Sequence, residues 1–237
     1  SSMTYEKIRR ECYEANLRIV REGLVLLTWG NVSVGDHEEG VFAIKPSGVS
    51  YDDLGPESMV IVDIESEKVV DGELRPSSDT ATHAELYRAF DRVGGIVHTH
   101  SHFAVCYAQA VRDIPILGTT HADHFRGPIP VTRDMTEDEV AEAYELNTGK
   151  VIVERFRREK LSEHDIPGVL VARHGPFAWG KSGNKAVENA MVLEEVAKMG
   201  LHTAALSSEE RAPVHLTEKH FTRKHGPNAY YGQPKAN

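Results

Sequence analysis

The chain has 237 residues, of which 40% are hydrophobic and 27% are charged, as expected for a globular protein with one sizeable core. Its formal net charge of −9 argues against a general binder of nucleic acids or membrane surfaces. No apolar run approaches the length of a transmembrane helix, and no secretory signal is recognisable, so we expect a cytoplasmic protein with no membrane partner. We interpret residues 1–237 as one domain, in which Ser1 and Ser2 before Met3 look like a cloning remnant.

The hydrophobic pattern changes several times along the chain between helical and strand-like periodicity. The expected elements, in chain order, are a helix over 4–22, strands near 25–34, 40–45, 58–64 and 67–71, a helix over 80–91, a strand from 94, a helix from His102 to Val111, a helix opened by a capping box at Thr136–Glu139 and running towards Lys160, a strand over 168–173, a helix over 184–205 and a weaker one over 217–225. Hairpins early and strand–helix pairs later predict an α/β domain with a mixed, largely antiparallel sheet covered by helices.

The two cysteines, Cys12 and Cys106, fall far apart in helical apolar patterns and form no CxxC motif. This spacing is typical of buried free thiols in a reducing compartment.

Three histidines fall within five residues in the segment GGIVHTHSH, which runs from Gly94 to His102. Its β-branched residues predict a strand, along which His98 and His100 project from the same face. Two imidazoles held in that way can bind one metal ion. Ser101 is expected to cap a helix that starts at His102, so His102 leaves that face. Two histidines satisfied by local hydrogen bonds at a strand end remain the alternative.

The segment GPFAWGKS (175–182) matches the phosphate-binding pattern GxxxxGK[ST] between a strand and a helix. A phosphate loop uses backbone N–H groups, however, and Pro176 has none. Phe177 and Trp179 are bulky where phosphate needs close approach. We therefore reject a nucleotide site and expect these two aromatic side chains to pack in the core or line a pocket.

A third histidine, His174, follows the strand-like segment 168–173 as His100 follows its own strand. Both would reach the sheet edge, where active sites tend to lie. A third histidine within reach would complete a three-ligand site with one position open to substrate. On local grounds, a turn-capping role before Gly175 is an equal alternative.

Three small polar segments look suited to an anion: WGNVS (29–33), IKPSG (44–48) and PSSDT (76–80). The last one opens a helix, whose first N–H groups can meet a phosphate. Each segment alone has a simpler interpretation: Asn31 forms a turn, Lys45 is a solvated charge, and Ser78 or Asp79 is a helix N-cap. Together they are more persuasive, because all three would serve one site. The side chains available are those of Asn31, Ser33, Lys45, Ser47, Ser77 and Ser78, with Gly48 in the second turn.

The segments TWGNVS, IKPSGV, PSSDT, GGIVHTHS, TTHADHF, GVLVARHGPFAWG and KHGPNAYYGQ, in this order, resemble the class II aldolase/epimerase family. The resemblance extends from about Tyr5 to Gln233 and is strongest to the 4-epimerases of that family. It implies a three-layer α/β/α sandwich around a central, mostly antiparallel mixed sheet. It also implies a cyclic homotetramer with active sites at the subunit interfaces.

The resemblance further implies one divalent metal ion per subunit, usually zinc, and it assigns roles residue by residue. Asp123 and Tyr231 would be the acid/base pair, and in the family both come from a neighbouring subunit. Supporting positions near the subunit interface would be Glu145, His220 and Arg223. The metal ligands would be Asp79, His98, His100 and His174, and the substrate phosphate would be held by Asn31, Lys45, Ser47, Gly48, Ser77 and Ser78.

The activity implied is interconversion of L-ribulose 5-phosphate and D-xylulose 5-phosphate, a phosphorylated pentulose pair of carbohydrate catabolism such as arabinose breakdown. A sugar-phosphate aldolase of the same family, which releases the aldehyde, is the nearest alternative, but those aldolases carry Glu where this chain has Asp79. A non-catalytic binding module like the head domain of adducin is a more distant one, because that module lacks the metal histidines.

Overall fold

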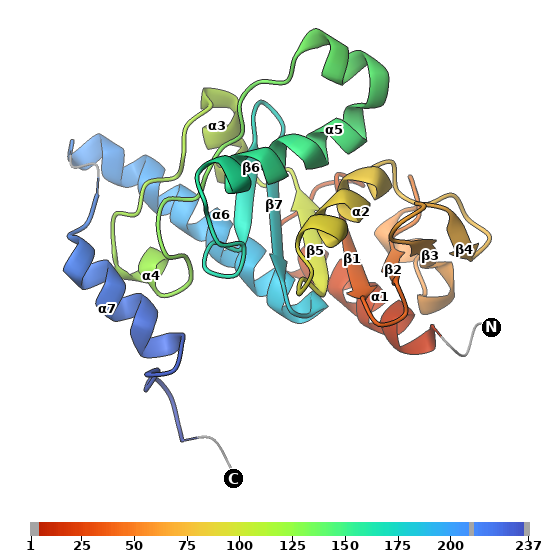
Figure 1. The fold of residues 1–237 in the computed structure, drawn as a ribbon, viewed down its shortest axis with the longest axis horizontal. Coiled ribbons are helices and arrows are strands. Elements are labelled where there is room, and N and C mark those ends of the chain that lie inside the picture. Colours follow the sequence, from red (N-terminus) through yellow and green to blue (C-terminus); the bar gives the residue numbers. More distant parts are fainter. Residues whose placement is uncertain (1–4, 209–210, 235–237) are drawn as a thin grey trace.

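The computed structural model describes residues 5–208 and 211–234, so Ser1, Ser2 and Met3 lie outside the described residues. Seven strands form one sheet in the order β4-β3-β2-β1-β5-β7-β6 (Figure 1). Every ladder between named strands is antiparallel, and an isolated bridge from Val131 to Leu170 is parallel. The expected α/β fold with a largely antiparallel sheet is therefore confirmed. The strands are β1 (Gly30–Asp36), β2 (Val41–Ile44), β3 (Val60–Asp63), β4 (Val69–Asp71), β5 (Gly95–Thr99), β6 (Gly168–Val171) and β7 (Gly175–Gly180).

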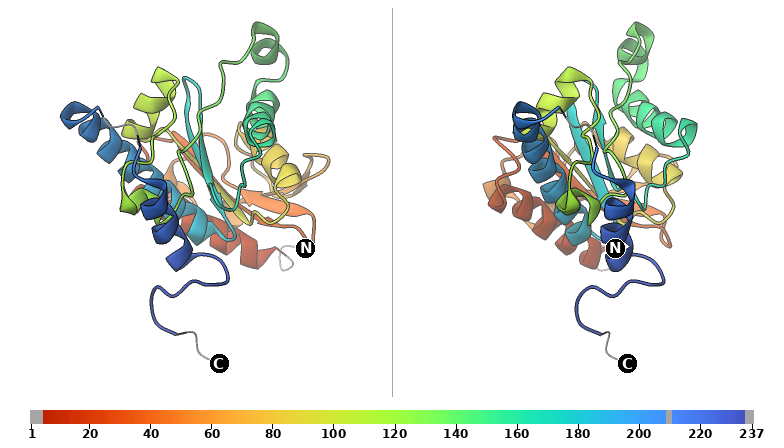
Figure 2. Two further views of the ribbon diagram at one scale, coloured as in Figure 1. Left: turned by 60° about the vertical axis from the view of Figure 1, so that its left-hand side comes forward. Right: turned by 90° about the vertical axis from the view of Figure 1, so that its left-hand side faces the viewer.

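Helices cover both faces of this sheet and make the three layers visible in Figure 2. Helices α1, α3 and α6 pack on one face, and α2 and α5 pack together on the other. Helices α4 and α7 contact each other beside α6, and no helix of the described residues is long and apolar enough to cross a membrane. The helices are α1 (Glu6–Arg21), α2 (Thr80–Ala89), α3 (His102–Ala110), α4 (Thr119–Ala122), α5 (Glu137–Arg158), α6 (Gly183–Leu206) and α7 (Val214–Lys224), with short 3-10 turns η1 (Tyr51–Asp53) and η2 (Pro56–Ser58).

The first helix shows how the apolar pattern becomes packing. Ile8, Cys12, Ala15 and Ile19 are spaced by three or four residues, so they share one face of α1 and are buried against the sheet. The Cys12 thiol donates a hydrogen bond to the Val32 carbonyl oxygen at 3.3 Å. Both cysteines are free as predicted, but Cys106 is only partly buried, so the prediction that it is buried is wrong.

One strand was not predicted: GPFAWG forms β7, which pairs with both β5 and β6. Its glycines and proline are unfavourable within strands, so the sequence does not indicate one here. Phe177 and Trp179 are buried, as expected. Two smaller differences occur elsewhere. Strand β1 begins only at Gly30, because residues 26–29 form a turn, and the short helix α4 was not expected.

The glycines before the histidine strand are required by a close approach of two backbones. A Cβ atom at Gly95 would lie 2.7 Å from the carbonyl oxygen of Ser182 and 2.8 Å from the nitrogen of Gly183. These atoms lie where the chain turns from β7 into α6. The close contact fixes strand β5 against that turn, and with it the histidines at the other end of the strand.

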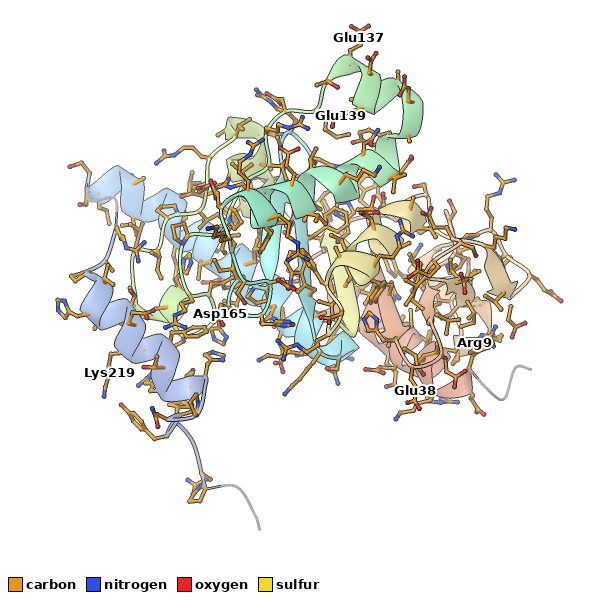
Figure 3. The ribbon with its side chains drawn as sticks, viewed as in Figure 1. Arg9, Glu38, Glu137, Glu139, Asp165 and Lys219 are labelled. Atoms are coloured by element: carbon orange, nitrogen blue, oxygen red, sulfur yellow. The ribbon has the colours of Figure 1, made fainter. Side chains whose placement is uncertain are left out.

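Helix α7 is held to the body of the protein by a small ion-pair cluster. Arg126 pairs with Glu218 of α7 at 2.7 Å and with Asp165, which is labelled in Figure 3, at 3.4 Å. Phe221 of the same helix is buried beneath the Arg126 guanidinium. These contacts fix the position of α7, which carries two of the predicted site residues.

Candidate metal and phosphate site

The sheet register places His98 at the centre of the site. His98 of β5 lies opposite Asn31 of β1 on one side and Phe177 of β7 on the other. Cross-strand partners share a face of the sheet, so these three side chains form a row. The imidazole of His98 stacks on the Phe177 ring with 4.2 Å between ring centroids, which fixes its plane.

The hydrogen bond of His98 to the backbone determines which of its ring nitrogens carries the proton. Its Nδ1 lies 2.9 Å from the carbonyl oxygen of Pro176, which can only accept, so Nδ1 carries the proton. In a neutral imidazole the lone pair is then on Nε2. This Nε2 lies 3.1 Å from Nε2 of His100, where a cation would have two nitrogens to bind. Backbone carbonyls commonly orient metal-binding histidines in this way.

His100 and His174 reach the same point from two different strand ends. His100 directly follows β5, and His174 lies in the turn between β6 and β7. One nitrogen from each of the three imidazoles lies within 4.8 Å of the others. Burial lowers the pKa of all three histidines below the usual value, and at His98 and His174 a neighbouring imidazole lowers it further. They are therefore neutral near pH 7, the form that binds metal.

Asp79 places a carboxylate beside this cluster. It is the N-cap residue of α2, but its side chain makes no capping hydrogen bond. Its Oδ2 instead accepts a hydrogen bond from Asn31 Nδ2 at 2.9 Å and lies 3.9 Å from His98 Nε2. Burial works to raise the pKa of Asp79, but His98, the Asn31 hydrogen bond and the more distant His83 and His174 outweigh it, so the pKa stays below its usual value.

These residues have the chemistry of a divalent-metal site. Three neutral imidazoles with converging nitrogens and one ionised carboxylate are a donor set that Zn²⁺ accepts, with room for a substrate oxygen. His98 and His100 lie in and directly after β5, and His174 lies in the turn between β6 and β7, which are the next two strands of the same sheet. The sheet therefore positions all three donors in advance.

The segments proposed to bind an anion line the same cavity, which has a volume of about 430 Å³. Two of them lie side by side, because Ser77 N–H donates to the Lys45 carbonyl and Ser47 N–H to the Arg75 carbonyl, both at 2.9 Å. All ten predicted metal and phosphate residues line this cavity: Asn31, Lys45, Ser47, Gly48, Ser77, Ser78, Asp79, His98, His100 and His174.

Lys45 gives the cavity a buried positive charge. Its ammonium donates to the carbonyl oxygens of Val49 at 2.9 Å and Pro46 at 3.3 Å and lies 4.9 Å from the Tyr51 ring centroid. No carboxylate of the described residues pairs with it. Burial lowers the pKa of Lys45, so an anion beside it would favour the charged form.

The predicted acid/base residues lie elsewhere in this chain. Asp123, which follows α4, accepts a hydrogen bond from His220 Nδ1 at 3.0 Å and pairs with Arg223 at 3.3 Å and Lys224 at 3.5 Å. The Tyr231 ring lies against the same two cations, at 5.0 and 4.2 Å. Asp123 and Tyr231 thus belong to one cluster around α7, and neither lines the histidine cavity.

The charges around Asp123 favour its ionised form. Burial works to raise its pKa, but the His220 hydrogen bond and the charges of Lys224 and Arg223 outweigh burial and hold the pKa below its usual value. The predicted supporting residues His220 and Arg223 are therefore direct partners of Asp123.

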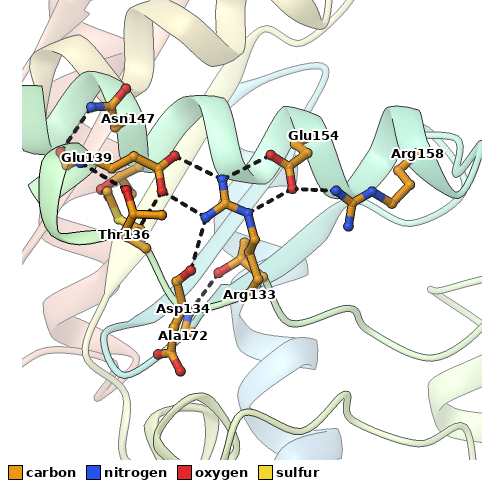
Figure 4. Close-up of polar contacts among 11 residues, drawn as sticks. Arg133, Asp134, Thr136, Glu139, Asn147, Glu154, Arg158 and Ala172 are labelled. Carbon is orange, nitrogen blue, oxygen red and sulfur yellow. Dashed lines mark hydrogen bonds and ion pairs between the residues drawn. The ribbon is translucent and has the colours of Figure 1, made fainter.

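Glu145, the remaining supporting residue, lines the histidine cavity together with Tyr144. Both follow a break in α5 at Ala143, where the backbone is extended (φ −151°, ψ 69°). Figure 4 shows how Arg133 joins the two parts of this helix, with hydrogen bonds to Glu139 and to Glu154. This network holds the break in place, and with it the side chains that cover the cavity.

Three cavity or near-cavity residues were missed by the sequence analysis. The Tyr144 hydroxyl lies 3.3 Å from His174 Nδ1, and the Trp29 ring lies 6.4 Å from the ring of His100. His83 is fully buried behind the cavity and contacts Asn31. Of these three, only His83 could have been recognised from the sequence. It lies four residues after Asp79 at the start of the predicted helix, so the two side chains point to the same side of that helix.

Comparison with known proteins agrees with this geometry. The model of the class II aldolase and adducin N-terminal domain matches residues 10–201, so the chain belongs to this family. The class II aldolases of this family are typically dependent on a divalent metal ion, and the cluster of His98, His100 and His174 could bind one.

Among solved structures, the fold is similar to that of an L-fuculose 1-phosphate aldolase, with 24% identity, a TM-score of 0.76, and coverage of 90% of this chain and 94% of that chain. It is also similar to L-fuculose 1-phosphate aldolase from Glaciozyma antarctica (17% identity, TM-score 0.73, 96% and 85% coverage). A third similar structure is l-fuculose-1-phosphate aldolase from Thermus thermophilus (24% identity, TM-score 0.67, 87% and 99% coverage). At these identities the likeness concerns the fold.

Proposed function

We propose that this protein is a zinc-dependent epimerase that interconverts L-ribulose 5-phosphate and D-xylulose 5-phosphate by breaking and re-forming the C3–C4 bond. The observation that carries the proposal is the single cavity that combines a histidine–aspartate metal site with the buried Lys45 and two serine-rich turns. A phosphorylated sugar fits that combination, with its phosphate at Lys45 and its keto end at the histidines.

Separate sets of residues would bind the metal ion and the substrate phosphate. Asp79, His98, His100 and His174 would hold the cation, which when bound would polarise the ketone and stabilise negative charge on its oxygen. Lys45 would neutralise the phosphate, and the side chains and backbone of Asn31, Ser47, Gly48, Ser77 and Ser78 would hydrogen-bond it.

The reaction requires carbon–carbon cleavage because the hydrogen on C4 is not acidic. A base takes the proton of the C4 hydroxyl, the C3–C4 bond breaks, and glycolaldehyde phosphate and the enediolate of dihydroxyacetone remain. The aldehyde turns about its tethered phosphate, the enediolate attacks its other face, and an acid returns a proton to the new C4 oxygen. One proton-transfer group is needed on each face of the aldehyde, and Asp123 and Tyr231 are our candidates.

Because these two groups lie outside the histidine cavity of their own chain, we propose that a neighbouring subunit supplies them. The proposed assembly is a cyclic homotetramer in the cytoplasm, with one site at each interface. The partly exposed Trp29 and Tyr144 at the cavity mouth would then be covered by the neighbour.

A sugar-phosphate aldolase is the second candidate, because solved structures of similar fold carry that name. Two features favour the epimerase: the shorter Asp79 at the position where the aldolases carry Glu, and the pairing of Asp123 with Tyr231 around Arg223. A non-catalytic module is less well supported, because the chain retains all three metal histidines.

A coupled assay tests the proposal directly. The zinc-loaded protein should convert L-ribulose 5-phosphate into D-xylulose 5-phosphate without net release of glycolaldehyde phosphate. Stoichiometric release of the aldehyde would identify the aldolase instead, and no turnover of either kind would contradict both enzyme proposals.

Mixing two inactive variants tests the shared site. His98→Asn removes a metal ligand and Tyr231→Phe removes a proton-transfer group, so in a mixed oligomer some interfaces combine two intact halves. We expect partial recovery of activity after the variants are unfolded and refolded together, and none when each is refolded alone. A fully active monomer in light scattering would contradict the proposal.

A further inference from the structure

A chain of buried hydrogen bonds runs behind the cavity and ends at Asp79. His83 of α2 is 0% exposed. Its Nδ1 lies 2.6 Å from Ser33 Oγ, and its Nε2 lies 2.6 Å from Asn31 Oδ1. At one end Ser33 Oγ lies 2.8 Å from the Tyr87 hydroxyl, and at the other Asn31 Nδ2 lies 2.9 Å from Asp79 Oδ2.

The chemistry of the end group fixes the direction of every bond in this chain. An ionised Asp79 can only accept, so Asn31 must present its NH₂ group to Asp79 and its oxygen to His83. An amide oxygen can only accept, so the proton of His83 is on Nε2. Nδ1 then accepts from the Ser33 hydroxyl, which in turn accepts from Tyr87. Burial lowers the pKa of His83 to about 4, which agrees with a neutral ring.

We infer that His83 is a positioning residue that fixes the orientation of the Asn31 amide through its Nε2–H. In this orientation one N–H of Asn31 holds Asp79, and the other is available to the phosphate. Without His83 the amide could turn over, and its oxygen would then face the Asp79 carboxylate and repel it. The inference rests on the proposed function, because it gives Asp79 and Asn31 their roles in metal and phosphate binding.

Three variants distinguish a role of His83 in positioning the Asn31 amide from a role only in packing the core. His83→Phe keeps a ring but removes both nitrogens, whereas His83→Gln can place an amide N–H near the former Nε2. His121→Phe is the matched control, because His121 is also a buried helical histidine, bonded to the Gly127 carbonyl at 2.7 Å and outside the cavity.

Zinc affinity, measured by competition with a chromophoric chelator, is the first readout. We expect His83→Phe to weaken zinc binding by about 10- to 100-fold, as is usual when a group supporting a metal ligand is lost. His83→Gln should recover most of this loss, and His121→Phe should bind zinc like the parent. Calorimetry with inorganic phosphate on the zinc-loaded proteins should rank the phosphate affinities of the parent and the three variants in the same order.

The tautomer of His83 in the parent protein is a second readout that needs no variant to fold. Long-range ¹H–¹⁵N spectra should show a neutral imidazole protonated at Nε2, and a proton on Nδ1 would overturn the inference. Unchanged zinc and phosphate affinities in His83→Phe would overturn it too, as would an equal loss in His121→Phe. A parent protein that binds no zinc would instead contradict the proposed function itself.

Discussion

Replacing His98 with alanine is expected to abolish stoichiometric zinc binding and nearly all activity while the fold is retained. His98 lies between the other donors: its Nε2 is 3.1 Å from that of His100 and 3.9 Å from the Asp79 carboxylate. Its ring is also within 4.8 Å of the His174 ring, centroid to centroid. Metal content by atomic spectroscopy, circular dichroism and the coupled assay measure the three parts of the prediction.

The same motif contains the control for this experiment. His102 is only four residues away, but it begins α3, is exposed, and does not line the cavity. His102→Ala should therefore keep one zinc ion per chain and parental activity. If His98→Ala binds zinc stoichiometrically and turns over normally, the metal site is assigned to the wrong residues.

The histidine strand shows what a local pattern can predict. Alternation along 95–99, the helix start at His102 and the capping box at Thr136 all follow from short-range rules, and the structure has each of them. One detail differs: the N-terminus of α3 is capped by Glu194 of α6, whose carboxylate accepts from two of its N–H groups, and not by the Ser101 side chain. Glu194 lies 91 positions from Phe103 along the chain, so no local sequence pattern predicts that it caps this helix.

The same limit applies to β7 and to the buried support of the site. The strand GPFAWG forms because β5 and β6 hydrogen-bond it on both sides, which outweighs the weak strand propensity of glycine and proline. Asn31 meets His98 only through the register of β1 and β5. Local rules interpret Asp79 only as an N-cap, and its proposed role as a metal ligand came from the family resemblance. The contact between Asn31 and His83 could be recognised only in the packed structure.

The structure also sharpens the choice between the two tyrosines of the C-terminal segment. Both are largely exposed, Tyr230 at 63% and Tyr231 at 60%. The Tyr230 ring lies against Lys219, which is not a partner of Asp123. The Tyr231 ring lies against Arg223 and Lys224, and both of these pair with Asp123. Tyr231 is therefore the tyrosine that shares its surroundings with the proposed acid/base partner.

Tyr231→Phe is accordingly expected to slow epimerisation by about 100- to 10,000-fold, the usual contribution of one positioned proton-transfer group. The substitution removes only the hydroxyl, so the ring contacts with Arg223 and Lys224, zinc binding and assembly should survive. Asp123 could still serve one face of the aldehyde, so slow condensation of dihydroxyacetone with glycolaldehyde phosphate should persist, with a changed product ratio at C4. The measurement compares epimerase rate and C4 stereochemistry in Tyr231→Phe and Tyr230→Phe. A near-parental rate in Tyr231→Phe, or a larger loss in Tyr230→Phe, would show that the hydroxyl of Tyr231 does not transfer the proton.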